Sequence, residues 1–173
     1  MRNFNPDFVD IVKDVTEAVR IRLQRSQLLY IHGFVEEINN SLIELSKNNT
    51  TDSQRYPAIL LIQPFRIQKG ADYYQLRGGK ILIAINTLSK YKAADRYTHN
   101  FYPILFPIYN AFLELLVKDS RVAPQDPDQI EHEMIELPFY GVDNGGTANI
   151  FSDMIDCIMI DNLSIKLKAS QTC

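Results

Sequence analysis

The segment NFYPILFPIYNAFLELLVK, residues 100–118, is the part of this 173-residue chain around which we expect the rest to fold. Its apolar side chains recur at helical spacing and form one stripe: Leu105, Ile108, Tyr109, Phe112, Leu115 and Leu116. Phe106, Leu113 and Val117 widen this stripe until little of the circumference is polar. A helix that is apolar nearly all round packs on more than one side, so this segment is predicted to be the central helix.

Two prolines restrict where the central helix can begin. Proline fits the first turn of a helix but interrupts its hydrogen bonds further inside. We therefore expect regular helix to begin between Tyr102 and Leu105, after a rigid lead-in over residues 101–104. Because the helix carries few polar groups, it is interpreted as a core element without chemistry of its own.

The composition is that of a single globular domain over residues 1–173, since 46% of the residues are apolar. This domain is expected to contain an N-terminal helical segment, about 6–48, and a sheet with the central helix, about 56–168. The longest apolar run, around Ile59 to Ile62, is too short to cross a bilayer, and the N-terminus lacks the apolar core of a signal peptide. The protein is therefore expected to be intracellular where it is made.

The charge is unevenly distributed along the chain, although the formal net charge is only −3. Residues 66–96 are strongly basic, whereas residues 119–161 are strongly acidic and contain Arg121 as their one cation. A chain divided in this way can attract a partner protein, a polyanion or a second copy of itself.

The N-terminal half is predicted to contain two helices. Asn5-Pro6-Asp7 resembles a helix start, and the apolar spacing that follows predicts a helix from residue 6 to about 24. Residues 28–33 are expected to form an extended segment with a turn, residues 34–47 a second helix, and residues 48–55 a polar surface loop.

The first strands of the sheet are predicted at 58–67 and 80–88. Pro64 places the first of them at a sheet edge or a bulge. The connection over residues 69–79 is too long for a tight hairpin turn and is expected to project as a loop or arm. Residues 89–99 form a second polar connection, rich in lysine, arginine and tyrosine.

The C-terminal half is predicted to end in a long strand. Residues 122–136 are expected to be an acidic loop around a short helical turn, 137–141 a short edge strand, and 143–147 a flexible turn. Residues 155–168 are apolar on both faces at first and alternate later, with polar Asp161-Asn162 between the halves. That pattern predicts a central strand that reaches the surface through a bulge. The fold class is α+β: an antiparallel sheet packed on one side by helices, with long projecting loops.

No set of residues in the sequence has the spacing of a catalytic or metal site. His32, His99 and His132 lack a second ligand at metal spacing, and Glu131-His132-Glu133 is interpreted as a solvated loop triplet. Neither glycine pair belongs to a phosphate-binding loop, and no activated nucleophile is evident. We expect a protein that is not an enzyme and that uses no cofactor.

The strongest functional signal is a basic stretch interleaved with tyrosines. Its members are Lys69, Tyr73, Tyr74, Arg77, Lys90, Tyr91, Lys92, Arg96 and Tyr97. Such side chains can hold phosphates and stack on bases, but tyrosine and arginine are also enriched at protein interfaces. The acidic chain and the lack of a nucleic-acid-binding motif favour the protein interface.

Several landmarks occur in an order that resembles the tail-completion and tail-terminator proteins of tailed bacteriophages. They are Tyr30-Ile31-His32-Gly33 before a helix, Tyr56-Pro57 before a strand, residues 101–109 at the start of the central helix, and Asp156 to Leu167 as the closing strand. Ring proteins in the neck of crAss-like phages are one subgroup of this kind.

The resemblance implies a structural virion protein, made in the host bacterial cytoplasm, that forms a homo-oligomeric ring at the head–tail junction. It further implies contacts with neighbouring neck, portal or tail proteins, contact with DNA in the lumen, and no catalytic residue. Ring symmetry, with six or twelve copies, and the level in the neck or tail stay open. The alternative is a nucleic-acid-binding accessory protein that uses the basic, tyrosine-rich loops 66–99.

The charge distribution suggests how copies would meet. A ring needs a heterologous interface, which the basic 66–96 region of one copy and the acidic 119–161 region of the next would supply. Loops 68–79 and 89–99 would then project and become ordered against a neighbour; the alternative is that both charged stretches face solvent or other proteins. The interface candidates are Tyr73, Tyr74, Arg77, Lys90, Lys92, Arg96, Glu131, Glu133, Glu136, Phe139 and Tyr140.

Overall fold

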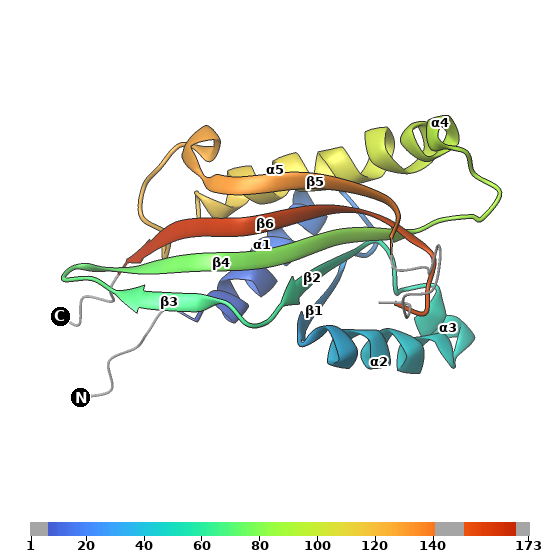
Figure 1. The fold of residues 1–173 in the computed structure, drawn as a ribbon, viewed down its shortest axis with the longest axis horizontal. Helices are drawn as coiled ribbons and strands as arrows, with labels where there is room; N and C mark the ends of the chain where they lie inside the picture. The colour runs from blue at the N-terminus through green and yellow to red at the C-terminus, as the bar shows by residue number, and fades with distance from the viewer. Residues whose placement is uncertain (1–6, 141–150, 169–173) are drawn as a thin grey trace.

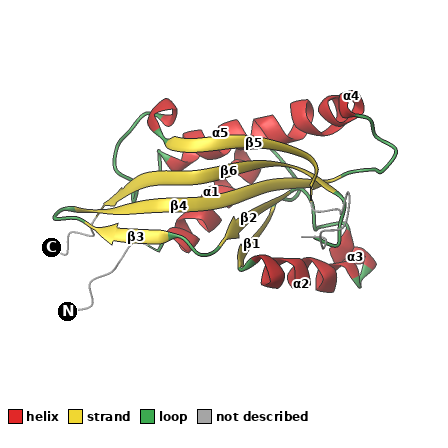
Figure 2. Cartoon of the chain, viewed as in Figure 1, coloured by secondary structure: helices red, strands yellow, loops and turns green. Residues whose placement is uncertain are grey.

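The computed structural model describes residues 7–140 and 151–168, and these form a six-stranded sheet with helices on both of its faces (Figures 1 and 2). The strand order is β1-β2-β4-β6-β5, and the short strand β3 pairs with residues 74–77 near the start of β4. All pairings are antiparallel except that of β1 with β2. The predicted α+β class is confirmed.

Two long strands form the middle of the sheet. β4 (Tyr73–Asn86) and β6 (Ile155–Lys168) run antiparallel over their whole length, from Tyr73 opposite Lys168 to Asn86 opposite Ile155. β2 (Ala58–Ile62) and β1 (Leu29–Gly33) extend the sheet beside β4, and β5 (Glu131–Tyr140) pairs along β6 on the other side.

The bulge expected in the last strand is present. Gly79 lies opposite Leu163 and Ile81 opposite Ile160, so Asp161 and Asn162 together face Lys80 alone. Asn162 adopts the left-handed φ of 53° that asparagine tolerates better than most residues. β6 lies between β4 and β5, as predicted for a central strand.

The predicted projecting loop over residues 69–79 is wrong. Residues from Tyr73 onward already belong to β4, and β3 (Arg66–Lys69) pairs with them through a short turn in which the Gly70 N–H donates to the Tyr73 carbonyl at 2.8 Å. Gly79 is buried beside Leu76 and Leu163, where a side chain would be tight, because an added β-carbon would lie 3.2 Å from the Leu163 Cβ. The expected single strand 58–67 is also interrupted, since residues 63–65, with Pro64 among them, separate β2 from β3.

One face of the sheet packs on two long helices. α1 (Phe8–Arg22) and α5 (Phe106–Leu116) contact each other and cover alternate residues of β2, β4 and β6, among them Ile59, Ile83 and Ile160. Asp7 caps α1 by accepting a hydrogen bond from the Val9 N–H at 2.9 Å. The expected capping residues Asn5 and Pro6 lie outside the described residues.

The other face is also covered, contrary to the predicted one-sided packing. α2 (Val35–Ser46) places Ile38 and Leu42 against Leu60 and Leu82 in a second apolar cluster. All five residues of β2 are buried, which requires apolar cover on both faces of the sheet. The loop expected at 48–55 contains a short helix, α3 (Asn49–Asp52).

The central helix begins earlier than predicted. α4 (Ala93–Arg96) continues into a π-helix, η1 (Tyr97–Leu105), and then into α5. Pro103 lies inside the π-helix, where hydrogen bonds span five residues and the α-helical turn that a proline ring obstructs is absent. The expected polar connection over 89–99 is therefore largely helical.

Candidate interaction surface

Basic side chains gather on the face of the sheet that points away from α1 and α5, on β3, the start of β4 and the end of β6. Leu76, Ile165 and Leu167 point into the helix-packed core, so their neighbours along the strands point the other way. This outward set, here called the basic face, consists of Arg66, Tyr73, Arg77, Lys166 and Lys168.

The members of the basic face are brought together by strand register. Arg66 lies directly opposite Arg77, and Tyr73 lies opposite Lys168. The Lys166 ammonium is 5.2 Å from the centre of the Tyr73 ring. Like charges directly opposite each other in a sheet repel, so the Arg66–Arg77 pair would be stabilised by an anionic partner.

A polar groove of about 800 Å³ runs beside the basic face. It forms where residues 124–130 leave the edge of β6, between the hydrogen bond from the Ala123 N–H to the Lys166 carbonyl and the pairing of Glu131 with Ser164. Its lining includes Gln75, Arg77, Gln125, Gln129, Glu131 and Lys166. The Gln125 Nε2 is buried without a hydrogen-bond partner among the described residues.

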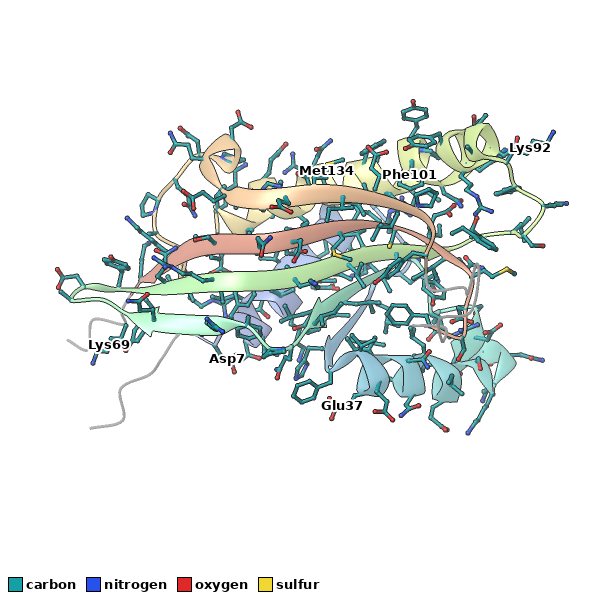
Figure 3. All side chains as sticks on the ribbon, viewed as in Figure 1. Asp7, Glu37, Lys69, Lys92, Phe101 and Met134 are labelled. Atoms are coloured by element: carbon teal, nitrogen blue, oxygen red, sulfur yellow. The ribbon has the colours of Figure 1, made fainter. Side chains whose placement is uncertain are left out.

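The residues 66–96 do not form one basic surface. Lys69 and Lys92 lie at opposite ends of the molecule in Figure 3, because β4 carries the chain along the full length of the sheet between them. Lys90 and Lys92 are exposed at the far end, whereas Arg77 and Tyr73 belong to the basic face.

Two predicted interface residues of this stretch are buried instead. Tyr74 is only 7% exposed and belongs to the core beneath α1 and α5. Arg96 is 6% exposed and makes an internal ion pair, in which its Nη1 lies 2.8 Å from Asp156 Oδ1. Arg96 was predicted to be exposed because a basic residue in a polar segment is normally solvated, and because its partner Asp156 is remote in sequence.

The Arg96–Asp156 pair is the centre of a buried polar network. Arg96 also donates to Thr87 Oγ1 at 2.7 Å and to the carbonyls of Leu88 and Tyr91. Asp156 is fully buried and accepts hydrogen bonds from Asn100 Nδ2 at 2.6 Å and from the Phe139 N–H at 2.9 Å. The network therefore joins the end of β4, the start of the central helix, β5 and β6.

The acidic interface candidates also divide into exposed residues and residues that are bonded within the chain. Glu131 and Glu133 are exposed on β5, which is an edge strand, so both are available to a partner. Glu136 instead accepts a hydrogen bond from the Tyr97 hydroxyl, and this bond raises the pKa of Tyr97 to about 12. Lys80 and Asp161 also pair within the chain, at 3.6 Å. Part of the charge contrast in the sequence is thus neutralised internally.

The aromatic candidates Phe139 and Tyr140 are half-buried and already engaged. The Arg96 guanidinium lies 4.7 Å from the centre of the Phe139 ring, and Phe139 adopts a left-handed φ of 56°. Tyr140 packs near Phe151 in the second apolar cluster. Both contact residues of their own chain and keep part of their surface exposed. The turn predicted at 143–147 lies outside the described residues.

The other polar groups are arranged for structure. His132 Nδ1 lies 2.8 Å from the Ile130 carbonyl, which can only accept, so Nδ1 carries a proton. Its Nε2 lies 2.6 Å from the Tyr109 hydroxyl, so the ring connects β5 to α5. Burial raises the pKa of the Cys157 thiol.

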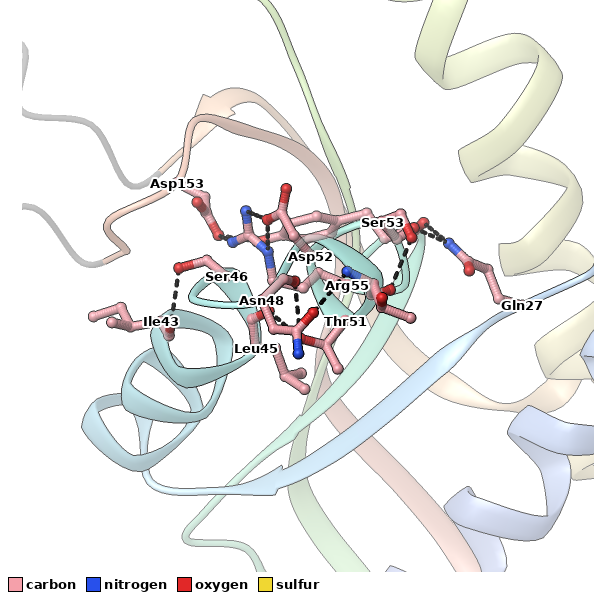
Figure 4. A network of polar contacts seen from close by, with 12 residues as sticks. Gln27, Ile43, Leu45, Ser46, Asn48, Thr51, Asp52, Ser53, Arg55 and Asp153 are labelled. Atoms are coloured by element: carbon pink, nitrogen blue, oxygen red, sulfur yellow. Dashed lines mark hydrogen bonds and ion pairs between the residues drawn. The ribbon is translucent and has the colours of Figure 1, made fainter.

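A second polar network ties α3 to the start of β6 (Figure 4). Arg55 pairs with Asp52 at 2.6 Å and with Asp153, which also accepts a hydrogen bond from the Tyr56 hydroxyl at 2.9 Å. Gln27 donates to the carbonyls of Ser53 and Tyr56. These contacts hold the start of β2 in place.

Within residues 7–140 and 151–168, no group of three or more histidine, cysteine, aspartate or glutamate side chains could hold a metal ion. None of the helices in these ranges has the length and hydropathy needed to cross a membrane.

The sequence placed Arg66 in the basic region 66–96, but the contributions of Lys166 and Lys168 to the basic face were missed. The alternation of residues 163–168 indicated that Lys166 and Lys168 share a face, but strand register was needed to place them beside Tyr73. Comparison of the chain with protein-family models, curated proteins and solved structures found no match.

Proposed function

We propose that this protein is a structural virion component that forms a homo-oligomeric ring at the head–tail junction, in the neck or at tail completion, of a tailed bacteriophage. The proposal is supported by sequence landmarks, three of which lie in regular elements of this fold. Residues 30–33 end β1 before α2, residues 101–109 join η1 to α5, and residues 156–167 lie in β6.

The observation that carries the proposal is that the sheet is open, with different edge strands on its two sides. β3 forms one edge, beside the first residues of β4, and β5 forms the opposite edge, beside residues 155–164 of β6. A ring requires two different contact surfaces on each subunit, and two unlike edges supply them. In the assembled particle, neighbouring neck, portal or tail proteins would contact the ring, and the lumen would face DNA.

The test is the mass of the purified protein in solution, measured by sedimentation and followed by electron microscopy of any oligomer. We expect a closed ring with a defined number of copies. A protein that stays monomeric at every concentration tested would refute the ring proposal.

The second candidate function is that of a nucleic-acid-binding accessory protein. The basic face supports it, because Arg66 and Arg77 lie directly opposite each other beside Lys166 and Tyr73. Cations there would hold phosphates, and the tyrosine would stack on a base.

Titration of single-stranded and duplex DNA at several salt concentrations tests this candidate. Tight binding by a monomer that weakens steeply with salt would favour it over the ring. The test variant carries Arg66→Glu and Arg77→Glu, which reverse two of the four cations of the basic face. The control variant carries Lys90→Glu and Lys92→Glu, which make the same charge change at the far end of the molecule. Only the first pair should abolish binding if the basic face is the site.

A further inference from the structure

We propose that neighbouring copies join by pairing strand β3 of one chain with strand β5 of the next, so that the sheet continues across the interface. This inference rests on the proposed ring and names the surfaces that would form it. In the part of the chain that the structure describes, β3 pairs with β4 alone and β5 with β6 alone. Each strand therefore keeps one edge whose backbone groups can pair with another strand.

The two edges carry opposite charges. All four residues of β3 are exposed, and Arg66 and Lys69 are its cations. On β5, Glu131 and Glu133 are exposed and point away from the helices, as Arg66 does. They do so because His132, which lies between them, bonds to Tyr109 of α5 on the helix side. Lys69 lies on the helix side, because it pairs with the core residue Tyr74. Arg66 is therefore the β3 cation that shares a face with the glutamates of β5. Opposite charges on one face of neighbouring strands stabilise a sheet, and in this respect β3 and β5 are complementary.

The same charges disfavour the alternative pairings. Two copies of β3 would place cations against cations, and two copies of β5 would place carboxylates against carboxylates. Both two-fold arrangements are therefore unfavourable, and the heterologous contact between β3 and β5 is favoured over them. Repetition of a heterologous contact produces a ring when the rotation closes.

Each edge also presents one apolar side chain on the helix side of the sheet. Ile67 and Met134 are each 39% exposed, although large apolar side chains are normally more deeply buried. Ile67 lies opposite Leu76 and Met134 opposite Ile160, and both of those partners point into the same core. β3 and β5 run antiparallel within the sheet of one chain, so they would also run antiparallel where the sheet continues into the next chain. In that direction, a register with Ile67 opposite Met134 places Gln68 opposite Glu133. Arg66 then lies diagonal to Glu133, within reach of the long arginine side chain.

Charged and short edge strands often serve the opposite purpose, since they prevent association. With only four residues in β3, a single contact would be weak, and closure of the ring would have to supply the remaining stability. Cross-linking and charge reversal distinguish these two interpretations.

The cross-linking experiment uses the full chain with Cys173→Ser, which leaves the buried Cys157. Directly opposite residues in a sheet are close enough for a disulfide after small adjustments. An Ile67→Cys chain mixed with a Met134→Cys chain should give a covalent dimer on mild oxidation, and neither chain alone should do so. Met154→Cys, at an exposed methionine outside the two edges, is the matched control and should not cross-link to Ile67→Cys.

The charge experiment reverses one edge and then the other. Arg66→Glu with Lys69→Glu should abolish the oligomer without threatening the fold, since the carboxylate introduced at position 66 would face Arg77 within the chain. Adding Glu131→Lys and Glu133→Lys in the same chain should restore it. Lys90→Glu with Lys92→Glu changes the charge equally at a distant site and should leave the oligomer intact.

The outcomes separate the two proposals. A wild-type protein that is only monomeric would refute both the ring and the edge pairing. A wild-type oligomer that survives reversal of Arg66 and Lys69, and that gives no cross-link between residues 67 and 134, would refute the edge pairing and leave the ring proposal standing.

Discussion

Replacing Asp156 by alanine should be among the most destabilising single changes in this protein. The carboxylate is fully buried and accepts hydrogen bonds from Arg96, Asn100 and the Phe139 N–H. Its removal leaves a guanidinium that is only 6% exposed without its counter-charge, together with two further donors that lose their acceptor. Breaking a buried ion pair from one side costs about 3–5 kcal/mol. That is a large part of the roughly 5–15 kcal/mol that holds a domain folded.

The assay is chemical unfolding followed by circular dichroism, with the free energy of unfolding extrapolated to water. A double-mutant cycle adds Arg96→Met, which keeps an apolar chain in place of the guanidinium stem. Because the charge that Asp156 compensates is then gone, the double variant should lose less stability than the sum of the two single changes.

The control is Glu17→Ala, which removes an ion pair of 2.6 Å with Arg20 on the exposed surface of α1. That pair is shorter than the buried one, but exposed ion pairs contribute little to stability because water screens them. The reasoning is refuted if Asp156→Ala costs no more than this control, because burial would then not be what makes the network important.

Three further predictions concern other parts of the fold. The hydrogen bond and charge of Arg121 lower the pKa of Asp119, so the stability that Asp119 contributes is present above its ordinary pKa and is lost as the pH falls through the lowered value; the difference in unfolding free energy between wild type and Asp119→Asn should therefore shrink in acid. Leu42→Ala should cost about 2–5 kcal/mol in chemical unfolding, since Leu42 is buried between α2 and the sheet. The Cys157 thiol, buried and with a raised pKa, should react with a thiol reagent only as fast as the protein opens, whereas rapid labelling of the native state would contradict its position in the structure.

The spacing of apolar residues along the chain predicted the bounds of some helices and strands well. β6 begins and ends where its alternation placed it, and α2 differs from its predicted range by one residue at each end. The first residues of β4 were missed because Gly78 and Gly79 resemble a turn, whereas Gly79 lies within the strand and packs closely against Leu163. The sequence pattern cannot distinguish a glycine that turns the chain from one that lets two strands approach.

The candidate surface was harder to predict, because charge in a sequence does not reveal which residues pair. Arg96 and Lys92 belong to the same basic segment, yet Arg96 neutralises Asp156, and Lys92 remains in solvent. Arg66 and Lys166 are far apart in sequence and meet on one face only through the register of β3, β4 and β6. The opposite charges of the two sheet edges likewise became visible only once the strand order was known.

The π-helical segment has a consequence for how the chain tolerates changes in length. η1 is held at its N-terminal end by Arg96, in its middle by Asn100 and Phe101, and at its C-terminal end by Leu105, through the buried network and the core. Between these fixed points it accommodates more residues per turn than an α-helix does. Gain or loss of one residue within 97–105 would therefore alter the winding of this segment, whereas the same change within α5 would rotate its apolar stripe away from the sheet.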